Sequence, residues 1–416
     1  QLIKAKPDFH KKTLLKPLHK SAEFCSTCHK THIPESVNHY RWLRAQNHYD
    51  SFLQSGVSGH RVDSFYYPDR AVPRCSACHM PLQASDDPAA RDFNDSGTRH
   101  VHSHQFPGAN TGIAHMVGLP ESVIDAHRDR LTGVTRIDIF GVKEDGHING
   151  RLHAPLRPGL PSLEPGRKYL LEIVVRTTGV GHHLTQGTSD SNELWLDVTA
   201  TAGERIIGRS GARNDTGRVD PWSYFLNSYV LDRDGNRIDR RNGQDIFVSL
   251  YNHQIPPGAA TVVHYLLEVP DDTRDPVVIE ANLNYRKFDT TYMQHMLGDE
   301  FTVNDLPITI MASDRIELPV GKGQDDMGFD LHPVAENERW NDYGIGLLRE
   351  GDSGSNKGEL RQAEQAFRQV EALGDMDGAM NLARVYFKEG RVNEASQALR
   401  RATAGDPPAP HWTIAW

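Results

Sequence analysis

The sequence predicts a multidomain protein with three parts: a loop- and helix-rich N-terminal module, an antiparallel β-sandwich and a set of α-helical hairpins. Three observations support this division. Residues 1 to about 130 show little sustained periodicity and contain two copies of a cysteine motif, residues 135–320 alternate apolar and polar side chains, and residues beyond about 335 have a helical repeat. At 416 residues the chain is long enough for two or three hydrophobic cores.

The cysteine motif of the N-terminal module is the pattern Cys-x-x-Cys-His. Its two copies, Cys25–His29 and Cys75–His79, contain every cysteine of the chain. Two thiols about one helical turn apart can form thioethers to the vinyl groups of one porphyrin, and the adjacent histidine can then bind the iron. We therefore predict two covalent haem c groups, attached at Cys25, Cys28, Cys75 and Cys78 and bound axially by His29 and His79.

Zinc is the main alternative for paired Cys-x-x-Cys units. A four-cysteine zinc site would leave both motif histidines without a role, and the two pairs lie farther apart than the ~15–20 residues usual in zinc ribbons. Haem attachment therefore explains more of the pattern than zinc does.

The composition of residues 1–130 fits a module built around its cofactors. Thirteen of the 22 histidines of the chain precede Arg130. Flat, apolar porphyrins can replace the side-chain core that such a loop-rich segment lacks, so we expect removal of haem to unfold it.

Residues 135–320 contain short alternating runs of the β type, separated by turn signals and without helical periodicity between them. This spacing predicts an antiparallel sandwich of the immunoglobulin-like kind, held by packing alone because no cysteine remains for a disulfide. The clearest strands are predicted at 169–175, 193–198, 261–269 and 277–285.

Residues 335–416 show a helical pattern with an internal repeat. Small, aromatic and proline residues in its second copy, such as Ala383, Tyr386 and Pro407, occupy the positions typical of a tetratricopeptide repeat of about 34 residues. Because about three repeats are needed to bury a core, we expect the series to be incomplete here, or this end to pack against the sandwich or a partner.

Charge and hydropathy restrict the partners and the location. The formal net charge of −9 argues against nucleic acid and fits docking on basic surfaces of redox partners. No apolar stretch approaches the ~20 residues of a membrane span, and residues 1–24 lack the apolar core of a signal peptide. Since haem is attached outside the cytoplasm, we expect an exported, periplasmic or extracellular protein whose export signal is missing from this sequence.

The sixth ligand of each iron must come from elsewhere in the chain. Methionine would raise the reduction potential relative to histidine, but only Met80 and Met116 lie in the haem region, and Met80 adjoins a motif histidine. Histidine is therefore the expected distal ligand.

The surroundings of the second motif resemble a recurring module of bacterial multihaem c-type cytochromes, such as the tetrahaem carriers of ammonia oxidisers and the pentahaem nitrite reductases. Residues 49–55 and His60 precede the Cys-x-x-Cys-His-Met-Pro segment, and His104-Gln-Phe-Pro-Gly follows it. In that family the histidines of both flanking segments are distal ligands. The resemblance implies these roles for His60 and His104, although Phe52 replaces the tryptophan of the family pattern.

Other histidines remain as alternatives. His19 and His102 are the next candidates for distal ligands, and His100, His102 and His104 would share one face of an extended segment. His39 and His48 fit surface groups or groups near the site equally well.

Polar residues of the sandwich also admit a metal interpretation. For His182, His183 and His253 we predict hydrogen bonds in the core or at an interface rather than metal binding. A calcium site at Asp190, Asn192 and Glu193 is a minor alternative.

The order of the parts, a haem module followed by a sandwich and tetratricopeptide repeats, also resembles a group of bacterial multihaem cytochromes. From the two haem motifs we predict electron transfer within an exported assembly, with the sandwich and the repeats docking redox proteins or multihaem subunits. The alternative is an oxidoreductase that acts on a small nitrogen or sulfur compound at an open haem site. We favour a carrier over a catalyst, because the sequence marks no substrate pocket.

Overall fold

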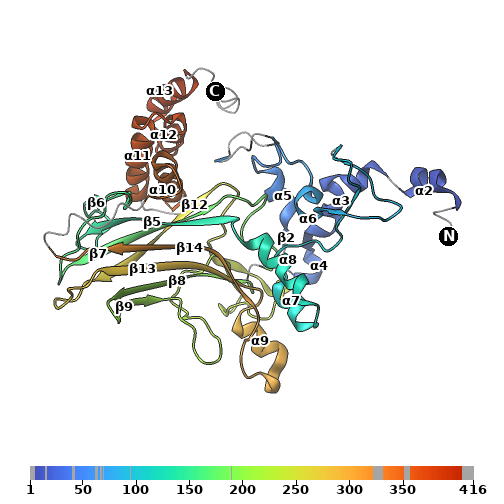
Figure 1. The fold of residues 1–416 in the computed structure, drawn as a ribbon, viewed down its shortest axis with the longest axis horizontal. Helices are drawn as coiled ribbons and strands as arrows, with labels where there is room; N and C mark the ends of the chain where they lie inside the picture. Colours follow the sequence, from blue (N-terminus) through green and yellow to red (C-terminus); the bar gives the residue numbers. More distant parts are fainter. Residues whose placement is uncertain are drawn as a thin grey trace.

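The computed structural model describes residues 5–14, 16–39, 43–60, 64–65, 68, 70–93, 95–188, 190–321, 331–350 and 357–404. It shows a multidomain, mixed α/β protein. Short helices of the N-terminal region flank the central antiparallel sheets, and the C-terminal helices stand at one side of these sheets (Figure 1). In the described parts of the chain, no helix combines the length and the apolar character needed to cross a membrane.

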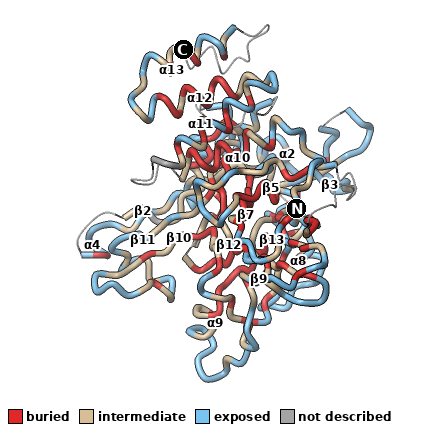
Figure 2. Tube along the Cα trace, turned by 90° about the vertical axis from the view of Figure 1, so that its left-hand side faces the viewer, coloured by how far each residue is buried: buried red, intermediate tan, exposed pale blue. Residues whose placement is uncertain are grey.

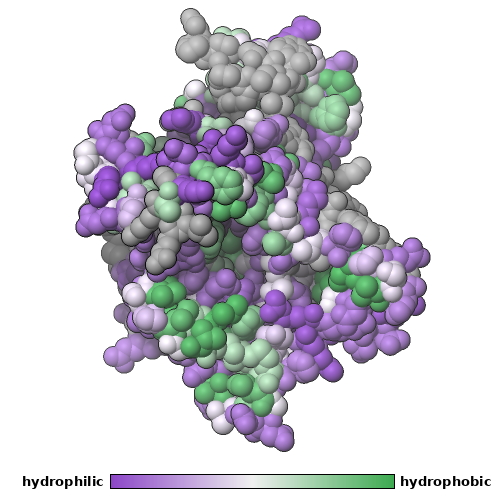
Figure 3. Space-filling view, turned by 90° about the vertical axis from the view of Figure 1, so that its right-hand side faces the viewer, coloured by the Kyte–Doolittle hydropathy of each residue, from purple (hydrophilic) through white to green (hydrophobic). Residues whose placement is uncertain are grey.

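The N-terminal region consists of short elements with few buried apolar side chains. Before residue 132, the described apolar side chains that are buried are Ala22, Phe52, Ala90, Ala114, Ile124 and Leu131. Large apolar side chains such as Phe24 and Val117 are exposed instead, and Figure 3 shows apolar patches on the side of the molecule where this region lies. The elements are α2 (Pro7–Leu14), η1 (Pro17–Lys20), α3 (Ala22–His29), β1 (Lys30–Ile33), α4 (Glu35–Asn38), β2 (Leu43–Asn47), α5 (His48–Leu53), α6 (Cys75–His79), β3 (Leu82–Ala84), β4 (His100–His102), α7 (Thr111–Met116) and α8 (Glu121–Leu131).

The first central sheet is antiparallel, with the strand order β12-β7-β5-β6. Its middle strands are buried on both faces, because helices cover one face and the second sheet covers the other. Ile173 pairs with Ile139 on one side and with Val263 on the other. The strands are β5 (Thr135–Glu144), β6 (Leu152–His153), β7 (Lys168–Thr177) and β12 (Ala260–Glu268).

The second sheet is also antiparallel, with the order β14-β13-β8-β9. Leu283 of its central strand pairs with Leu196, and both side chains are fully buried. Trp195 is fully buried as well and donates its indole N–H to the Gly211 carbonyl at 3.2 Å. The strands are β8 (Glu193–Ala202), β9 (Arg205–Ser210), β13 (Val277–Arg286) and β14 (Ile308–Leu318), and the smaller elements beside them are β10 (Ser228–Leu231), η2 (Gly243–Asp245), β11 (Val248–Asn252), α9 (Thr290–Leu297) and η3 (Gly298–Glu300).

The four runs predicted as strands form β7, β8, β12 and β13; β7, β8 and β13 are inner strands, and β12 is an edge strand of the first sheet. Helix α9, which directly follows β13, was not predicted. The Asp289 side chain caps this helix by accepting a hydrogen bond from the Tyr292 backbone N–H at 2.7 Å. A helix is therefore present within residues 135–320, for which the sequence periodicity predicted only strands.

The C-terminal helices are α10 (Glu336–Glu350), α11 (Lys357–Ala372), α12 (Met376–Lys388) and α13 (Val392–Thr403). Successive helices pack against one another, and glycines allow close approach. A Cβ on Gly344 would lie 2.6 Å from the Phe367 ring, and one on Gly346 would lie 2.6 Å from Val262 of β12. The helices and both sheets share one hydrophobic core, which Figure 2 shows as buried segments along the central strands and helices. The expectation that this end packs against the sheets is met.

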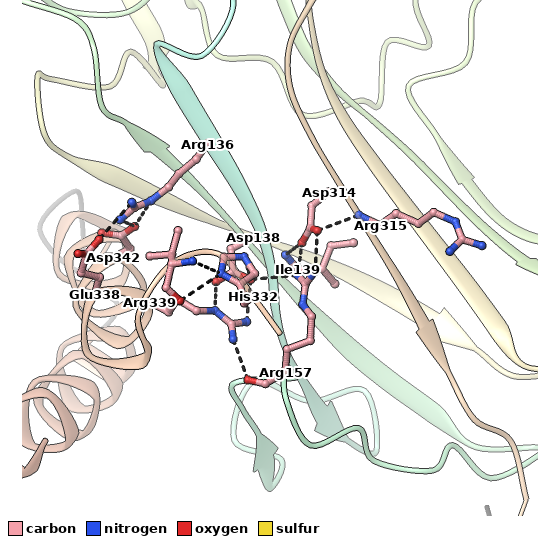
Figure 4. Close-up of polar contacts among 11 residues, drawn as sticks. Arg136, Asp138, Ile139, Arg157, Asp314, Arg315, His332, Glu338, Arg339 and Asp342 are labelled. Carbon is pink, nitrogen blue, oxygen red and sulfur yellow. Dashed lines mark hydrogen bonds and ion pairs between the residues drawn. The ribbon is translucent and has the colours of Figure 1, made fainter. Parts of the chain in front are cut away.

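A buried ion-pair network fixes α10 on the first sheet (Figure 4). The Arg339 guanidinium donates two hydrogen bonds to the Asp138 carboxylate, at 2.7 and 2.9 Å, and one to the Arg157 carbonyl at 2.9 Å. Arg157 itself pairs with Asp314 of β14 at 2.5 Å. One network of opposite charges therefore joins the helices to strands of both sheets.

A cavity of 480 Å³ lies where the first sheet, the helices and the N-terminal region meet. Ser64 and Phe65 of the N-terminal region line it. The Arg384 guanidinium lies 4.5 Å from the centre of the Phe65 ring and donates to the Ser64 carbonyl at 2.9 Å, and Arg176 of β7 donates to the Phe65 carbonyl at 3.5 Å. The N-terminal region is thus attached to the helices directly and not only through the sheets.

Candidate cofactor site

The two cysteine motifs lie on neighbouring helices. Helix α3 carries the first motif at its C-terminal end, and α6 consists of the second motif alone. In a helix, residues three positions apart project to the same side, so both thiols of each motif can reach one flat group. The two helices are in contact, and the four cysteines are free thiols.

The Cys75 thiol is held in its neutral form where the motifs meet. Burial raises the pKa of Cys75 to about 12, and the neighbouring Cys25 thiol adds to this effect. Among the described residues, no cysteine belongs to a group of three or more potential metal ligands within 4.8 Å of one another.

Four histidine rings form a continuous series between the motifs, here called the histidine array: His29, His48, His182 and His79. The centre of the His48 ring lies 5.2 Å from that of His29 and 5.0 Å from that of His182. The ring of His182 is parallel to that of His79, with centres 6.3 Å apart and planes at 6°. The structure thus brings one further imidazole to each motif histidine.

The two histidines between the motifs come from distant parts of the chain. His48 begins α5, whose N-terminus is capped by the Asn47 side chain, and His182 lies in the loop between β7 and β8. This loop packs closely on α5, since a Cβ on Gly181 would lie 3.4 Å from the Phe52 ring and one on Gly187 would lie 3.9 Å from His48. Tertiary packing of the sheet loop against the N-terminal region therefore assembles the array.

Burial favours the neutral form of three imidazoles of the array, those of His48, His182 and His79. It is the largest cause that lowers the pKa of His48 to about 3 and that of His182 to about 4. Burial also lowers the pKa of His79, with Arg130 contributing. A neutral imidazole keeps a lone pair on one ring nitrogen, which is the form that binds a metal.

Hydrogen bonds fix which nitrogen would bind. His79 donates through Nδ1 to the Pro107 carbonyl at 2.9 Å, and His182 does so to the His183 carbonyl at 3.1 Å. Each ring then presents Nε2 as its free acceptor, an arrangement typical of metal-binding histidines. Pro107 belongs to the segment after His104 that the family resemblance singled out, and its carbonyl orients the motif histidine.

The other predicted ligands lie outside the array and are exposed. His104 donates through Nδ1 to the His102 carbonyl at 3.0 Å, and His102 does so to the Met80 carbonyl at 2.8 Å. The ring contacts of His19, His102 and His104 are with Phe24, Phe93 and Phe106, respectively. The backbone N–H of His60 donates to the Ser58 hydroxyl at 3.2 Å. The assignment of these four histidines as distal ligands stays a prediction.

The surroundings of the array fit a haem group. Three cationic side chains lie near the site and lower the pKa values of its histidines. Arg130 acts on His79, Lys287 acts on His48 and on the neighbouring His127, and Arg349 acts on the neighbouring His183. The Nδ1 atom of His48 is buried without a hydrogen-bond partner. Neutral nitrogen ligands, nearby cations and exposed apolar side chains suit an apolar iron porphyrin with anionic propionates.

Two of the remaining sequence candidates have partners within the sheet region, namely Glu193 and His253. Glu193 of the proposed calcium site is buried and forms an ion pair with Arg286, so its carboxylate is already neutralised. His253 stacks on Tyr224 and Tyr251, with ring centres 5.0 and 4.4 Å away, and donates to the Phe225 carbonyl. Its predicted role in hydrogen bonding is confirmed.

Among the described residues, Asp138, Asp314 and His332 have ligand atoms within 4.8 Å of one another. Both carboxylates already pair with guanidinium groups, namely Arg339 with Asp138 and Arg157 with Asp314. These residues are therefore part of the ion-pair network of Figure 4.

No family model and no curated protein matches the chain. Among solved structures, the chain is similar to a penta-heme cytochrome c552 from Thermochromatium tepidum, with 14% sequence identity and a TM-score of 0.42. The similarity covers 72% of this chain and 56% of that chain, so the chain spans little more than half of that protein's length.

Proposed function

We propose that the chain is an electron-transfer c-type cytochrome that holds two covalent haem groups within an exported redox assembly. The observation that carries this proposal is the meeting of α3 and α6, each with a complete Cys-x-x-Cys-His motif, beside the histidine array. Haem supplies one-electron iron chemistry when it is bound. The chain's own residues attach it, orient it and exclude water from it.

Each motif supplies two attachment points and one axial ligand. Cys25 and Cys28 would hold the first haem with His29 as its proximal ligand, and the second motif would do the same through His79. The Pro107 carbonyl orients His79 and increases the basicity of its free nitrogen.

For the distal ligands, the geometry favours His48 for the first haem and His182 for the second. Both are neutral and lie next to a motif histidine. The family resemblance favours His60 and His104, with His19 and His102 as further alternatives. Two imidazoles on each iron would leave no open position for a substrate, which supports a carrier over an oxidoreductase.

The finer architecture belongs to the same proposal. The domain bounds 1–130, 135–320 and 335–416 are supported by α8, which ends at Leu131, and by α10, which begins at Glu336. The paired sheets support an immunoglobulin-like sandwich, and the close crossing at Gly344 supports tetratricopeptide hairpins. We assign docking of redox proteins or multihaem subunits to these two parts, and a periplasmic or extracellular location to the whole.

The experiment that tests the proposal counts haem groups and reads their spin state. Intact mass and a pyridine haemochrome spectrum should give two covalent haems per chain, and electron paramagnetic resonance of the oxidised protein should give two low-spin signals. A protein without haem mass would refute the proposal. A high-spin ferric signal would instead support the oxidoreductase alternative.

A further inference from the structure

Lys287 is a buried lysine beside the N-terminal region. It directly follows β13, and only 9% of its surface is exposed. Helix α7 covers it so closely that a Cβ on Gly112 would lie 2.8 Å from the Lys287 Cβ. Figure 1 shows α7 and α8 beside the end of β13. The lysine thus lies at the junction of the second sheet and the cysteine-motif region.

The described residues give this ammonium group no anionic partner. Its neighbours in sequence have other partners: Arg286 pairs with Glu193, and Asp289 pairs with Arg237 at 3.0 Å. The described contact of Lys287 Nζ is with the Phe288 ring, 5.6 Å from its centre. A buried charge without a counterion is costly, so the native protein is expected to supply an anion here.

The electrostatic neighbours of Lys287 belong to the cofactor site. Its charge lowers the pKa of His48, after burial and the other imidazoles, and also that of His127. The Gly108 backbone N–H donates a hydrogen bond to His127 Nδ1, and Gly108 directly follows Pro107, whose carbonyl orients His79. Burial, with a contribution from Arg241, lowers the pKa of Lys287 itself to about 8, so the ammonium is largely protonated at pH 7.

Haem propionates are a second source of anions for the site beside Lys287, in addition to the carboxylates of this chain. Each haem group carries two propionate carboxylates, and an ammonium is a good donor to a carboxylate in a site of low polarity. At the start of α7, the helix that covers Lys287, Thr111 is fully buried and its hydroxyl has no hydrogen-bond partner. This second unpartnered group precedes Gly112, the residue that contacts Lys287.

We propose that Lys287 binds a propionate carboxylate of one of the two haem groups and raises the reduction potential of that haem. The inference rests on the proposed function. A fixed positive charge near the iron favours the ferrous over the ferric state, because the ferrous centre carries one positive charge less. Lys287 is therefore a cofactor-binding residue supplied by the sheet rather than by the motif region.

The test is a spectroelectrochemical titration of the holoprotein at about pH 6, where the ammonium is protonated. Lys287→Met should lower one of the two midpoint potentials, with a roughly tenfold smaller reduced-to-oxidised ratio at fixed ambient potential, or about 59 mV. Lys168→Met is the matched control, because Lys168 is exposed at the start of β7 and pairs with Glu268. It should leave both potentials unchanged.

Two outcomes separate the failure of this inference from that of the proposed function. If the wild type carries two haems and Lys287→Met leaves both potentials unchanged, the inference is wrong and the proposed function stands. If the wild type carries no covalent haem, the proposed function itself is wrong. If Lys287→Met does not fold, Lys287→Gln, which keeps a polar side chain, gives the same test. Unchanged midpoint potentials in the glutamine variant would also overturn the inference.

Discussion

Replacing Arg339 by methionine should destabilise the attachment of the C-terminal helices to the first sheet. The Arg339 side chain is only 2% exposed and makes two charge-assisted hydrogen bonds to Asp138, whose side chain is 8% exposed. Methionine keeps the apolar stem but removes the charge. The Asp138 carboxylate would then remain buried with Arg157 at 3.6 Å as its nearest cation, and Arg157 already pairs with Asp314.

The size of the effect follows from this incomplete compensation. Removing one partner of a buried ion pair costs about 3–5 kcal/mol, because the other charge stays desolvated. Since Arg157 compensates part of the charge, we expect about 3 kcal/mol for Arg339→Met. Removing both charges, in the double variant Arg339→Met with Asp138→Leu, should bring the free energy of unfolding back to within about 1 kcal/mol of the wild type.

The measurement is urea unfolding followed by far-ultraviolet circular dichroism, with the two single variants and the double variant forming a cycle. Arg315→Met is the matched control, because Arg315 lies on β14 next to the network but its charge is exposed, beside Glu280 and Glu317 (Figure 4). It should unfold like the wild type. A loss below about 1 kcal/mol for Arg339→Met, the size typical of exposed pairs, would refute the reasoning.

Three further predictions concern the cofactor site. Replacing Cys75 and Cys78 by alanine should remove one haem from the intact mass and leave the other; a variant with both haems would contradict attachment at these thiols. His182→Ala should convert one low-spin signal to high spin in paramagnetic resonance, whereas His104→Ala should not, and the opposite result would restore the ligand set of the family resemblance. Protein produced without haem attachment should be cleaved by protease within residues 5–131, because the N-terminal region buries few apolar side chains. Its sheets and C-terminal helices should resist cleavage. Equal resistance of both parts would contradict a cofactor-dependent core.

Strands with alternating or apolar runs could be predicted from the sequence, because their pattern reflects burial directly. The strand at Thr135–Glu144 was harder to recognise, since Asp138 and Lys143 give it a polar appearance. The structure buries both charges through ion pairs, with Arg339 and with Glu172 at 3.0 Å. These partners come from other elements, so the pattern of a single segment does not reveal them.

The same limit applies to the cofactor site. The motif residues could be nominated from the sequence because their spacing is local and chemically specific, and their role in haem attachment stays a prediction. His48 was left open between a surface group and a group near the site, and His182 was assigned to hydrogen bonding, because their proximity depends on a loop of the sheet that packs against Phe52. The glycine before His182, which permits this close packing, is the one local signal that could have drawn attention to it.

The contact of Ser64 and Phe65 with Arg176 and Arg384 has a consequence for how a partner protein would exchange electrons with this chain. Tunnelling rates depend steeply on the separation of donor and acceptor, and a hinge between the docking surface and the motif region would make that separation variable. The Arg384 guanidinium of a helix contacts both residues and the Arg176 guanidinium of a strand contacts Phe65, which opposes such hinge motion. If a redox partner docks on the C-terminal helices, as we propose, its distance to the haem groups of this chain would therefore stay constant.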